Sequence, residues 1–166
     1  MPIRDSSLEG ELFNIDESGV LNGFYMLSLL HYLKSCTLDE LATAMYLFRF
    51  VNITEQLLGD NDQIEYLSGI PEWERYNLDT MLSNVLIEKY TDRFKTGLKE
   101  LISRGMILNE GQDILLLDSV RENSRDILED KRFNLVVHKA KYVSKLIETF
   151  SIEELNEKIK TLIGGT

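Results

Sequence analysis

The sequence contains few of the residues that support metal binding, thiol chemistry or covalent cross-links. It has one cysteine, Cys36, so no disulfide bond can form within the chain, and nothing in its cysteine usage indicates an oxidising compartment. Its two histidines, His31 and His138, are widely separated, and a zinc site would need carboxylates around one of them. From these residues we expect no metal and no cofactor.

The short motifs that mark nucleotide binding and hydrolytic catalysis are also missing. The sequence contains no HExxH, CxxC, GxGxxG, GxxxxGK[ST] or GxSxG pattern. Its many carboxylates show no spacing that singles out a general acid and a general base. We therefore expect a binding or scaffolding protein without catalytic residues, and not an enzyme.

Basic residues and long apolar runs are both scarce. There are 18 Lys and Arg against 28 Asp and Glu, which gives a net charge of -10. Broad attraction to DNA, RNA or anionic lipid is not expected from such a chain, so any contact of that kind needs a local basic patch. The first residues lack the apolar core of a signal peptide, and no apolar stretch approaches the ~20 residues that span a bilayer. We expect a cytoplasmic protein with no membrane contact.

The length and the apolar content suit one compact domain. The chain has 166 residues, of which 43% are hydrophobic and 28% are charged, values that are ordinary for a globular protein. Residues 1–20 form an acidic lead-in, and residues 21–166 are predicted to form a single helical domain.

Helix signals dominate the first half of that domain. A nearly all-apolar helix is predicted from Leu21 to about residue 35, with Asn22 as its cap. Thr37 and Glu40 form a capping box that opens a second helix, which is expected to end at Gly59. Residues 60–63 are predicted to form a turn, and residues 64–76 to form a loop or one short turn of helix.

The next segment combines helices with a β-hairpin. A short helix is expected from about Leu78 to Tyr90, and a second over 92–104 with Phe94, Leu98, Leu101 and Ile102 inward. Gly105 ends that helix, and residues 106–117 have the pattern of a hairpin with glycine in its turn. This order predicts a mainly α fold with a winged-helix-like core, in which the hairpin is the wing. A helical domain with an incidental hairpin is the alternative.

Three further helices are expected after the hairpin. They cover residues 120–129, residues 133–150 and a last stretch to about Ile163. Ser151 and Glu154 form a second capping box, which opens the last of the three.

Two basic segments are candidate contact patches in this acidic chain. Residues 89–104 hold five bases against two acids, and residues 131–145 hold five bases and no acid. The candidate residues are Arg93, Lys95, Lys99, Lys139, Lys141 and Lys145. Each segment could contact an acidic partner or a nucleic-acid backbone, or it could be a solvated helix face whose charges are paired elsewhere. The acidic wing tip, around Glu110 and Asp113, disfavours DNA.

Aromatic residues are unusually frequent between residues 24 and 51. They either pack centrally between two helices or form a subunit interface, where aromatic residues are enriched. The candidate partner-binding residues are Phe24, Tyr25, Leu29, Tyr32, Tyr46, Phe48 and Phe50.

The order of elements over residues 21–163 resembles that of the middle component of bacterial ABC-three-component systems, the Lamassu-type defence operons. The segments that carry the resemblance are LNGFYMLSLLHYLKS, TLDELATAMYLFRFV, TDRFKTGLKELISRGMILNEGQDILLLD and HKAKYVSKLIETFSIEELNEKIKTLIG. The family's Asn-Pro-x-[Phe/Tyr] signature falls on Asn22-Gly23-Phe24-Tyr25, where the proline is missing, and its later glycine is replaced near Ser144.

The resemblance implies an accessory subunit of an antiphage defence complex. Such a subunit docks on an SMC-like ATPase and restrains or positions the effector nuclease, with DNA contacted only within the complex. The family attributes no catalytic residues to this component. The alternative from the residues themselves is a winged-helix transcription regulator that binds DNA through the helix at 92–104.

Overall fold

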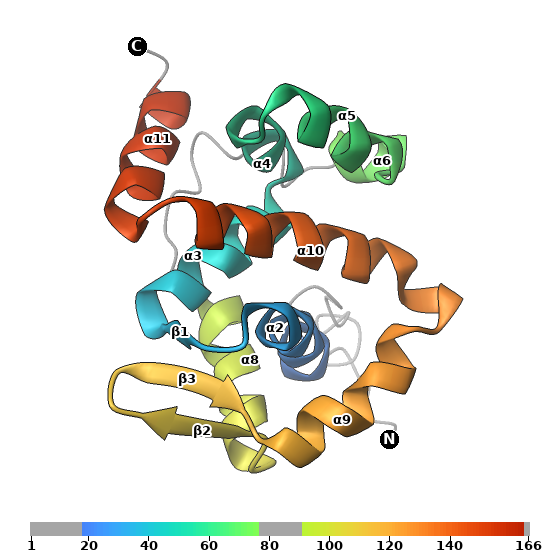
Figure 1. Ribbon diagram of the computed structural model, residues 1–166, viewed down its shortest axis with the longest axis vertical. Coiled ribbons are helices and arrows are strands. Elements are labelled where there is room, and N and C mark those ends of the chain that lie inside the picture. The colour runs from blue at the N-terminus through green and yellow to red at the C-terminus, as the bar shows by residue number, and fades with distance from the viewer. Residues whose placement is uncertain (1–17, 77–90, 165–166) are drawn as a thin grey trace, which may run out of the picture.

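The structure is a computed structural model that describes residues 18–76 and 91–164 (Figure 1). The acidic residues 1–17 and the helix expected between residues 78 and 90 lie outside the described residues.

The described chain is mainly helical and carries one small antiparallel sheet, as the sequence predicts. Its helices are α2 (Gly19–Leu33), α3 (Leu38–Arg49), α4 (Val51–Leu57), α5 (Asp60–Ser68), α6 (Glu72–Arg75), α8 (Asp92–Ser103), α9 (Asp118–Leu128), the 3-10 turn η2 (Lys131–Phe133), α10 (Asn134–Thr149) and α11 (Ile152–Gly164). Its strands are β1 (Cys36–Thr37), β2 (Ile107–Glu110) and β3 (Asp113–Leu116).

The strands form one sheet in the order β1-β3-β2. The hairpin joins β2 to β3 as predicted, with Asn109 opposite Ile114 and with Gly111 in the turn at a φ of 66°. A positive φ is easily adopted only by glycine, so this residue closes the turn. Strand β1, which precedes α3, pairs with β3 through Cys36 opposite Ile114. The winged-helix core stays a prediction.

Helices α3 and α11 begin at the capping boxes that the sequence predicts. Thr37 Oγ1 accepts the Glu40 amide at 3.1 Å while Glu40 Oε2 accepts the Thr37 amide at 3.1 Å. Ser151 and Glu154 form the same reciprocal pair before α11. Asn22, however, does not cap α2. Ser18 does so, because its Oγ accepts the Leu21 amide, and Asn22 Nδ2 instead donates to the Ser18 carbonyl.

The second predicted helix is broken, and the predicted turn after it is helical. At Phe50 the backbone leaves the helical region (φ −102°, ψ 84°), so α3 ends and α4 begins in a new direction. Thr54 Oγ1 donates to the Leu47 carbonyl, which satisfies an acceptor at the break. Gly59 has an ordinary φ of −68° and precedes α5, whose first turn holds Asp60 and Asp62. Acidic side chains are favourable there because they face the positive end of the helix dipole.

Helix α10 runs through the middle of the molecule and organises its packing (Figure 1). In this view α4, α5 and α6 lie on one side of it, and α2, α8, the hairpin and α9 lie on the other. Its buried residues Ala140, Val143 and Ile147 belong to one core with residues from α4 and α5 on one side and from α2, α8 and the sheet on the other. The core therefore joins both sides of α10.

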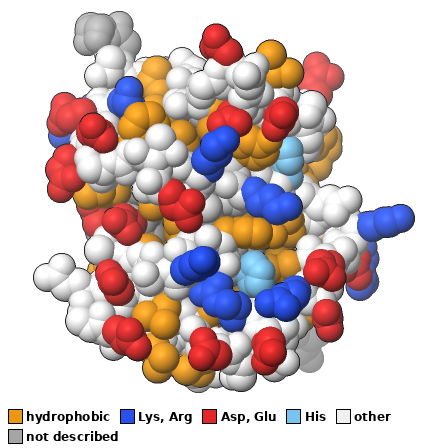
Figure 2. Space-filling view, viewed as in Figure 1, with side chains coloured by type: hydrophobic (Ala, Val, Ile, Leu, Met, Phe, Trp, Pro, Cys, Tyr) orange, Lys and Arg blue, Asp and Glu red, His pale blue; other side chains and the backbone are white. Residues whose placement is uncertain are grey.

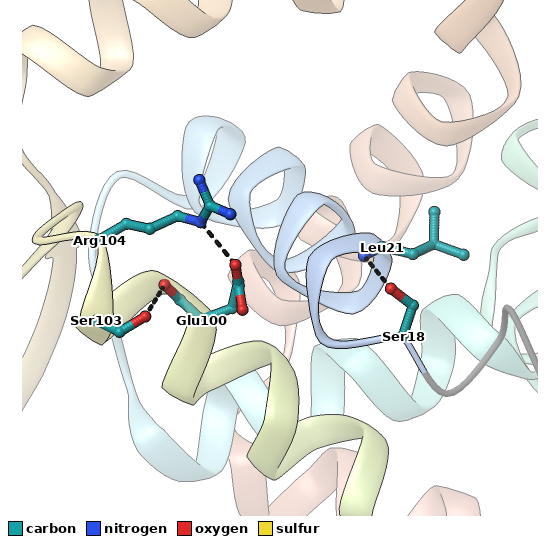
Figure 3. A network of polar contacts seen from close by, with 5 residues as sticks. All are labelled: Ser18, Leu21, Glu100, Ser103 and Arg104. Atoms are coloured by element: carbon teal, nitrogen blue, oxygen red, sulfur yellow. Dashed lines mark hydrogen bonds and ion pairs between the residues drawn. The ribbon is translucent and has the colours of Figure 1, made fainter. Parts of the chain in front are cut away.

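Helices α2 and α8 pack closely because glycines replace side chains at their contact. A Cβ atom added to Gly97 would lie 3.0 Å from the backbone carbon of Asn22, and one added to Gly23 would lie 3.3 Å from Glu100 Cβ. Figure 3 shows the neighbouring ends, with Ser18 on the α2 side and the Glu100–Arg104 ion pair (2.6 Å) on α8. This contact turns Phe94, Gly97 and Leu101 inward, so Ile102 is 58% exposed instead of inward.

Candidate functional site

Most of the polar side chains predicted as a patch on α10 contact acidic residues of the same chain. Four side chains of α10 donate to α5 and α6: His138 Nε2 to the Tyr66 carbonyl (2.7 Å), Lys139 Nζ to Glu74 (2.5 Å), Tyr142 Oη to Glu65 (2.7 Å) and Lys145 Nζ to Asp62 (2.5 Å). We call these four contacts the α10 clasp. They hold the acidic helices α5 and α6 against α10, which has an excess of bases.

The clasp corrects part of the predicted basic patch. Lys139 is 5% exposed, and besides its ion pair its ammonium group lies 4.3 Å from the centroid of the Phe48 ring. A buried and paired lysine cannot serve a surface contact. Lys145 is exposed but paired with Asp62. Of the three lysines predicted as a patch on α10, only Lys141 has no ion pair with a residue that the structure describes.

The candidates on α8 lie on a separate surface. Lys95 and Lys99 are exposed, and Arg93 is half-buried. Arg104, at the end of the helix, is paired with Glu100. The turn of the hairpin that follows α8 carries the exposed Glu110 and Asp113. The positive charge on this surface is therefore limited to α8 and does not continue onto the hairpin.

The aromatic candidates divide into buried and half-buried residues. Leu29, Tyr46, Phe48 and Phe50 are between 0% and 5% exposed in the core of this chain, which corrects their assignment to a partner surface. They fill the interior because α10 covers the helices that carry them. Phe24, Tyr25 and Tyr32 are half-buried, and their contact with a partner stays a prediction.

The C-terminal end of α2 meets α9 at a strongly positive site. The guanidinium of Arg121 donates to three backbone carbonyls, those of His31 (2.6 Å), Leu30 (3.2 Å) and Lys34 (3.1 Å). The last carbonyls of a helix have no partners within it, so a cation at this position satisfies them and also complements the helix dipole. Lys34 continues the chain with a φ of 67° and is exposed.

Further cations surround this helix end. Arg125 lies one turn beyond Arg121 on α9, and its charge acts on His31. Lys141 Nζ of α10 lies 5.8 Å from the centroid of the Tyr32 ring, which itself packs edge-on against His31. Lys34, Arg125 and Lys141 are exposed, and none of them has an ion pair with a residue in the described part of the chain.

We call this surface the basic face. Its members are His31, Tyr32, Lys34, Arg121, Arg125 and Lys141. Figure 2 shows Lys and Arg side chains gathered over the middle and lower part of this side of the molecule, with Asp and Glu side chains around them. In a chain of net charge -10, such a grouping attracts anions locally although the whole molecule repels them.

The basic face shifts the titration of its own members. Partial burial, and then the charges of Arg121 and Arg125, lower the pKa of His31 below its usual value. Partial burial, and then the carboxylate of Glu129, raise the pKa of Tyr32. His31 is therefore neutral at physiological pH, and the positive charge of the face comes from its lysines and arginines.

The sequence pattern identified one cation of this face, Lys141, and missed Lys34, Arg121 and Arg125. In sequence the last two lie among acids, in the segment Asp118–Glu129, which has no net positive charge. Their spacing of four residues places both on one side of α9. The spacing of these two arginines indicates that they share one side of α9. Only the packing of α9 on α2 shows that this side faces the end of α2.

Cys36, the one cysteine of the chain, is buried and has a structural role. Burial, and then the carboxylates of Glu40 and Asp113, raise the pKa of Cys36 to about 12, so its thiol stays protonated and unreactive. No group of three or more metal-binding side chains occurs within residues 18–76 and 91–164. Among the helices of those same ranges, none is both long enough and apolar enough to span a bilayer.

Comparison with known proteins yields no relative. No protein-family model matches the chain, and neither a curated protein nor a solved structure is significantly similar to it.

Proposed function

We propose that this protein is a non-catalytic accessory subunit of an antiphage defence complex, which docks on an SMC-like ATPase subunit and restrains or positions an effector nuclease. The observation that supports docking is the basic face, where Lys34, Arg125 and Lys141 are exposed and unpaired within the described chain. The specific assembly is proposed from the resemblance in element order over residues 21–163.

The grouping of the exposed cations supports this assignment of the basic face. Lys139, Lys145, Arg132 and Arg104 each have an acidic partner in the described chain. Other exposed lysines, such as Lys95 and Lys99 on α8, have no ion pair with a described residue either, so the lack of a pair alone does not distinguish the basic face. The basic face differs because its cations gather at the end of one helix, with Lys141 beside the ring of Tyr32, and Arg and Tyr are enriched in protein interfaces.

Co-expression with the products of the neighbouring reading frames tests the proposal. We expect an SMC-like ATPase to be encoded beside this gene and to co-purify with a tagged copy of this chain. A defence assay in cells should then lose protection when the gene is deleted. If no such ATPase is encoded nearby, or if the chain purifies alone from cells that express every neighbour, the proposal is wrong.

A winged-helix DNA-binding regulator is the second candidate function. It is favoured by one specific observation: β1 lies between α2 and α3 in sequence and pairs with β3 of the hairpin that follows α8. This is the strand pairing expected of a winged helix, with α8 in the position of the recognition helix. Lys95 and Lys99 are exposed on α8, whereas the acidic hairpin tip opposes contact with phosphates.

A gel-shift series with DNA from upstream of the gene separates the two functions. A regulator should bind this DNA with an affinity that falls steeply with salt, and Lys95→Glu with Lys99→Glu should abolish binding. An accessory subunit should show no shift on its own. Binding that survives both charge reversals would exclude the α8 mode of recognition.

A further inference from the structure

We propose that the basic face binds a short segment rich in aspartate and glutamate on a protein partner. This inference rests on the proposed function and adds to it the chemistry of the partner. Arg121 binds the backbone carbonyl of Lys34 at the end of α2, Arg125 acts on His31 from the next turn of α9, and the Lys141 ammonium lies 5.8 Å from the ring of the half-buried Tyr32. A carboxylate-rich segment complements the charge of these four cations, and Tyr32 offers an apolar surface beside Lys141.

Two residues of the face, Arg121 and Tyr32, are held in place by contacts within the chain before any partner binds. Arg121 uses its guanidinium on three carbonyls at the end of α2, so it contributes charge and position instead of direct contacts. The centroid of the Tyr32 ring lies 5.1 Å from that of the His31 ring and 5.8 Å from the Lys141 ammonium. Groups that are already ordered lose little conformational entropy on binding, which favours affinity.

The acids at the border of the face favour a short protein segment over a nucleic acid. Glu122, Asp126 and Glu129 are exposed on α9 and at its C-terminal end, and the charge of Glu129 acts on Tyr32. A nucleic-acid backbone carries a phosphate at each step, so it would pass over these carboxylates and be repelled. A short peptide can end before it reaches them.

Fluorescence anisotropy with defined probes tests this inference on the full chain. The probes are a labelled Asp/Glu-rich peptide, a labelled Gly-Ser peptide of the same length and a labelled DNA duplex. We expect only the acidic peptide to bind, and we expect its binding to weaken as salt is added. Tight binding of the duplex with no binding of the peptide would overturn the inference in favour of a nucleic acid.

Two triple charge reversals with the same change in net charge locate the binding site. Lys34→Glu, Arg125→Glu and Lys141→Glu should weaken peptide binding about tenfold or more, because each change replaces an attraction by a repulsion. The control carries Lys95→Glu, Lys99→Glu and Lys160→Glu on exposed helix surfaces elsewhere. An equal loss in the control would show general attraction and overturn the inference.

Two further measurements keep the result interpretable. Thermal unfolding should show both triple variants folded, and the milder single change Lys141→Ala should still weaken peptide binding. A change of oligomeric state in the first variant would identify a second copy of this chain as the occupant and overturn the inference. If the wild-type chain co-purifies with its ATPase but does not bind the acidic peptide, the inference fails and the proposed function stands.

Discussion

At the scale of single residues, the contact between α2 and α8 depends on Gly97. Its missing side chain lets the two backbones approach, since an added Cβ would meet backbone and side-chain atoms of Asn22 at 3.0 to 3.1 Å. A backbone cannot move aside as the end of a flexible side chain can. The sequence shows this glycine only as an interruption in a helical pattern, so its role is visible only in the packed structure.

We expect Gly97→Ala to destabilise the protein by about 1–3 kcal/mol, because the helices must separate to admit the methyl group. Gly59→Ala is the matched control, since a Cβ there meets nothing within 4 Å and should change stability by less than about 0.5 kcal/mol. Urea unfolding of both variants measures the difference. Equal midpoints for the two variants would show that α2 and α8 adjust without strain.

Tyr46 is a second residue whose effect can be predicted. Its hydroxyl is buried and has no hydrogen-bond partner among the residues that the structure describes, and burial raises the pKa of Tyr46 to about 12. A buried hydroxyl without a partner costs free energy. Tyr46→Phe should therefore leave stability unchanged or raise it by roughly 1 kcal/mol, as thermal unfolding would show. A clear loss of stability would indicate that the hydroxyl has a partner.

At the scale of elements, the α10 clasp joins helices that are distant in sequence. Its central ion pair, Lys139 with Glu74, joins residues 65 positions apart, and the two side chains are 6% and 14% exposed. Breaking a buried pair leaves one charge in a medium of low dielectric constant, whereas removing both charges does not. The clasp is therefore sensitive to single changes.

We expect Lys139→Met alone and Glu74→Leu alone each to destabilise the protein by about 3–5 kcal/mol, and the double variant to recover most of that loss. The matched control is Lys145→Met with Asp62→Leu, a pair between α10 and α5 whose side chains are 55% and 28% exposed. That exposed pair should contribute about 1 kcal/mol or less. A double-mutant cycle on each pair gives the comparison, and equal coupling energies would contradict the role of burial.

The break between α3 and α4 is also decided at this scale. Phe50 ends α3 because its ring is buried against Tyr46, with ring centroids 4.8 Å apart, and the chain changes direction to place it there. The β-branched residues Val51, Ile53 and Thr54 that follow lower the helix propensity slightly. That signal was present in the sequence, but it is too weak to overcome the apolar periodicity, which continues through the break.

At the scale of the whole molecule, acid should loosen the packing of α9 on α2. The pKa of His31 is lowered in the folded protein from 6.5, so the unfolded chain binds a proton more readily than the folded chain does. Stability should therefore fall as the pH drops through about 6.5 towards the lower folded pKa. Protonated His31 would also lie beside Arg121 and Arg125 as a like charge.

His31→Gln should reduce this pH dependence, because glutamine does not titrate. Urea unfolding of wild type and variant at neutral and at mildly acidic pH measures the difference in slope, which isolates His31 from the carboxylates common to both. If the two slopes are the same, His31 titrates alike in the folded and the unfolded chain, and the prediction is wrong.

Much of the local structure follows from adjacent residues. Groups within a few residues of each other form the capping boxes at Thr37 and Ser151. The same holds for the end of α8 before Gly105 and for the hairpin turn at Gly111. The mainly α fold class follows from the same short-range preferences. These interactions need no distant partner, so they can be predicted from adjacent residues alone.

The accessibility of the charged groups and the aromatic rings depends on how distant segments pack together. Lys139 and Lys141 flank Ala140 in the sequence, yet one is buried against Glu74 and the other lies exposed beside Tyr32. Arg121 became part of the basic face through carbonyls that are 87 to 91 residues away. Burial and charge pairing depend on contacts between distant segments. A periodic pattern predicts which side of a helix is buried, but it does not predict which helix packs against that side.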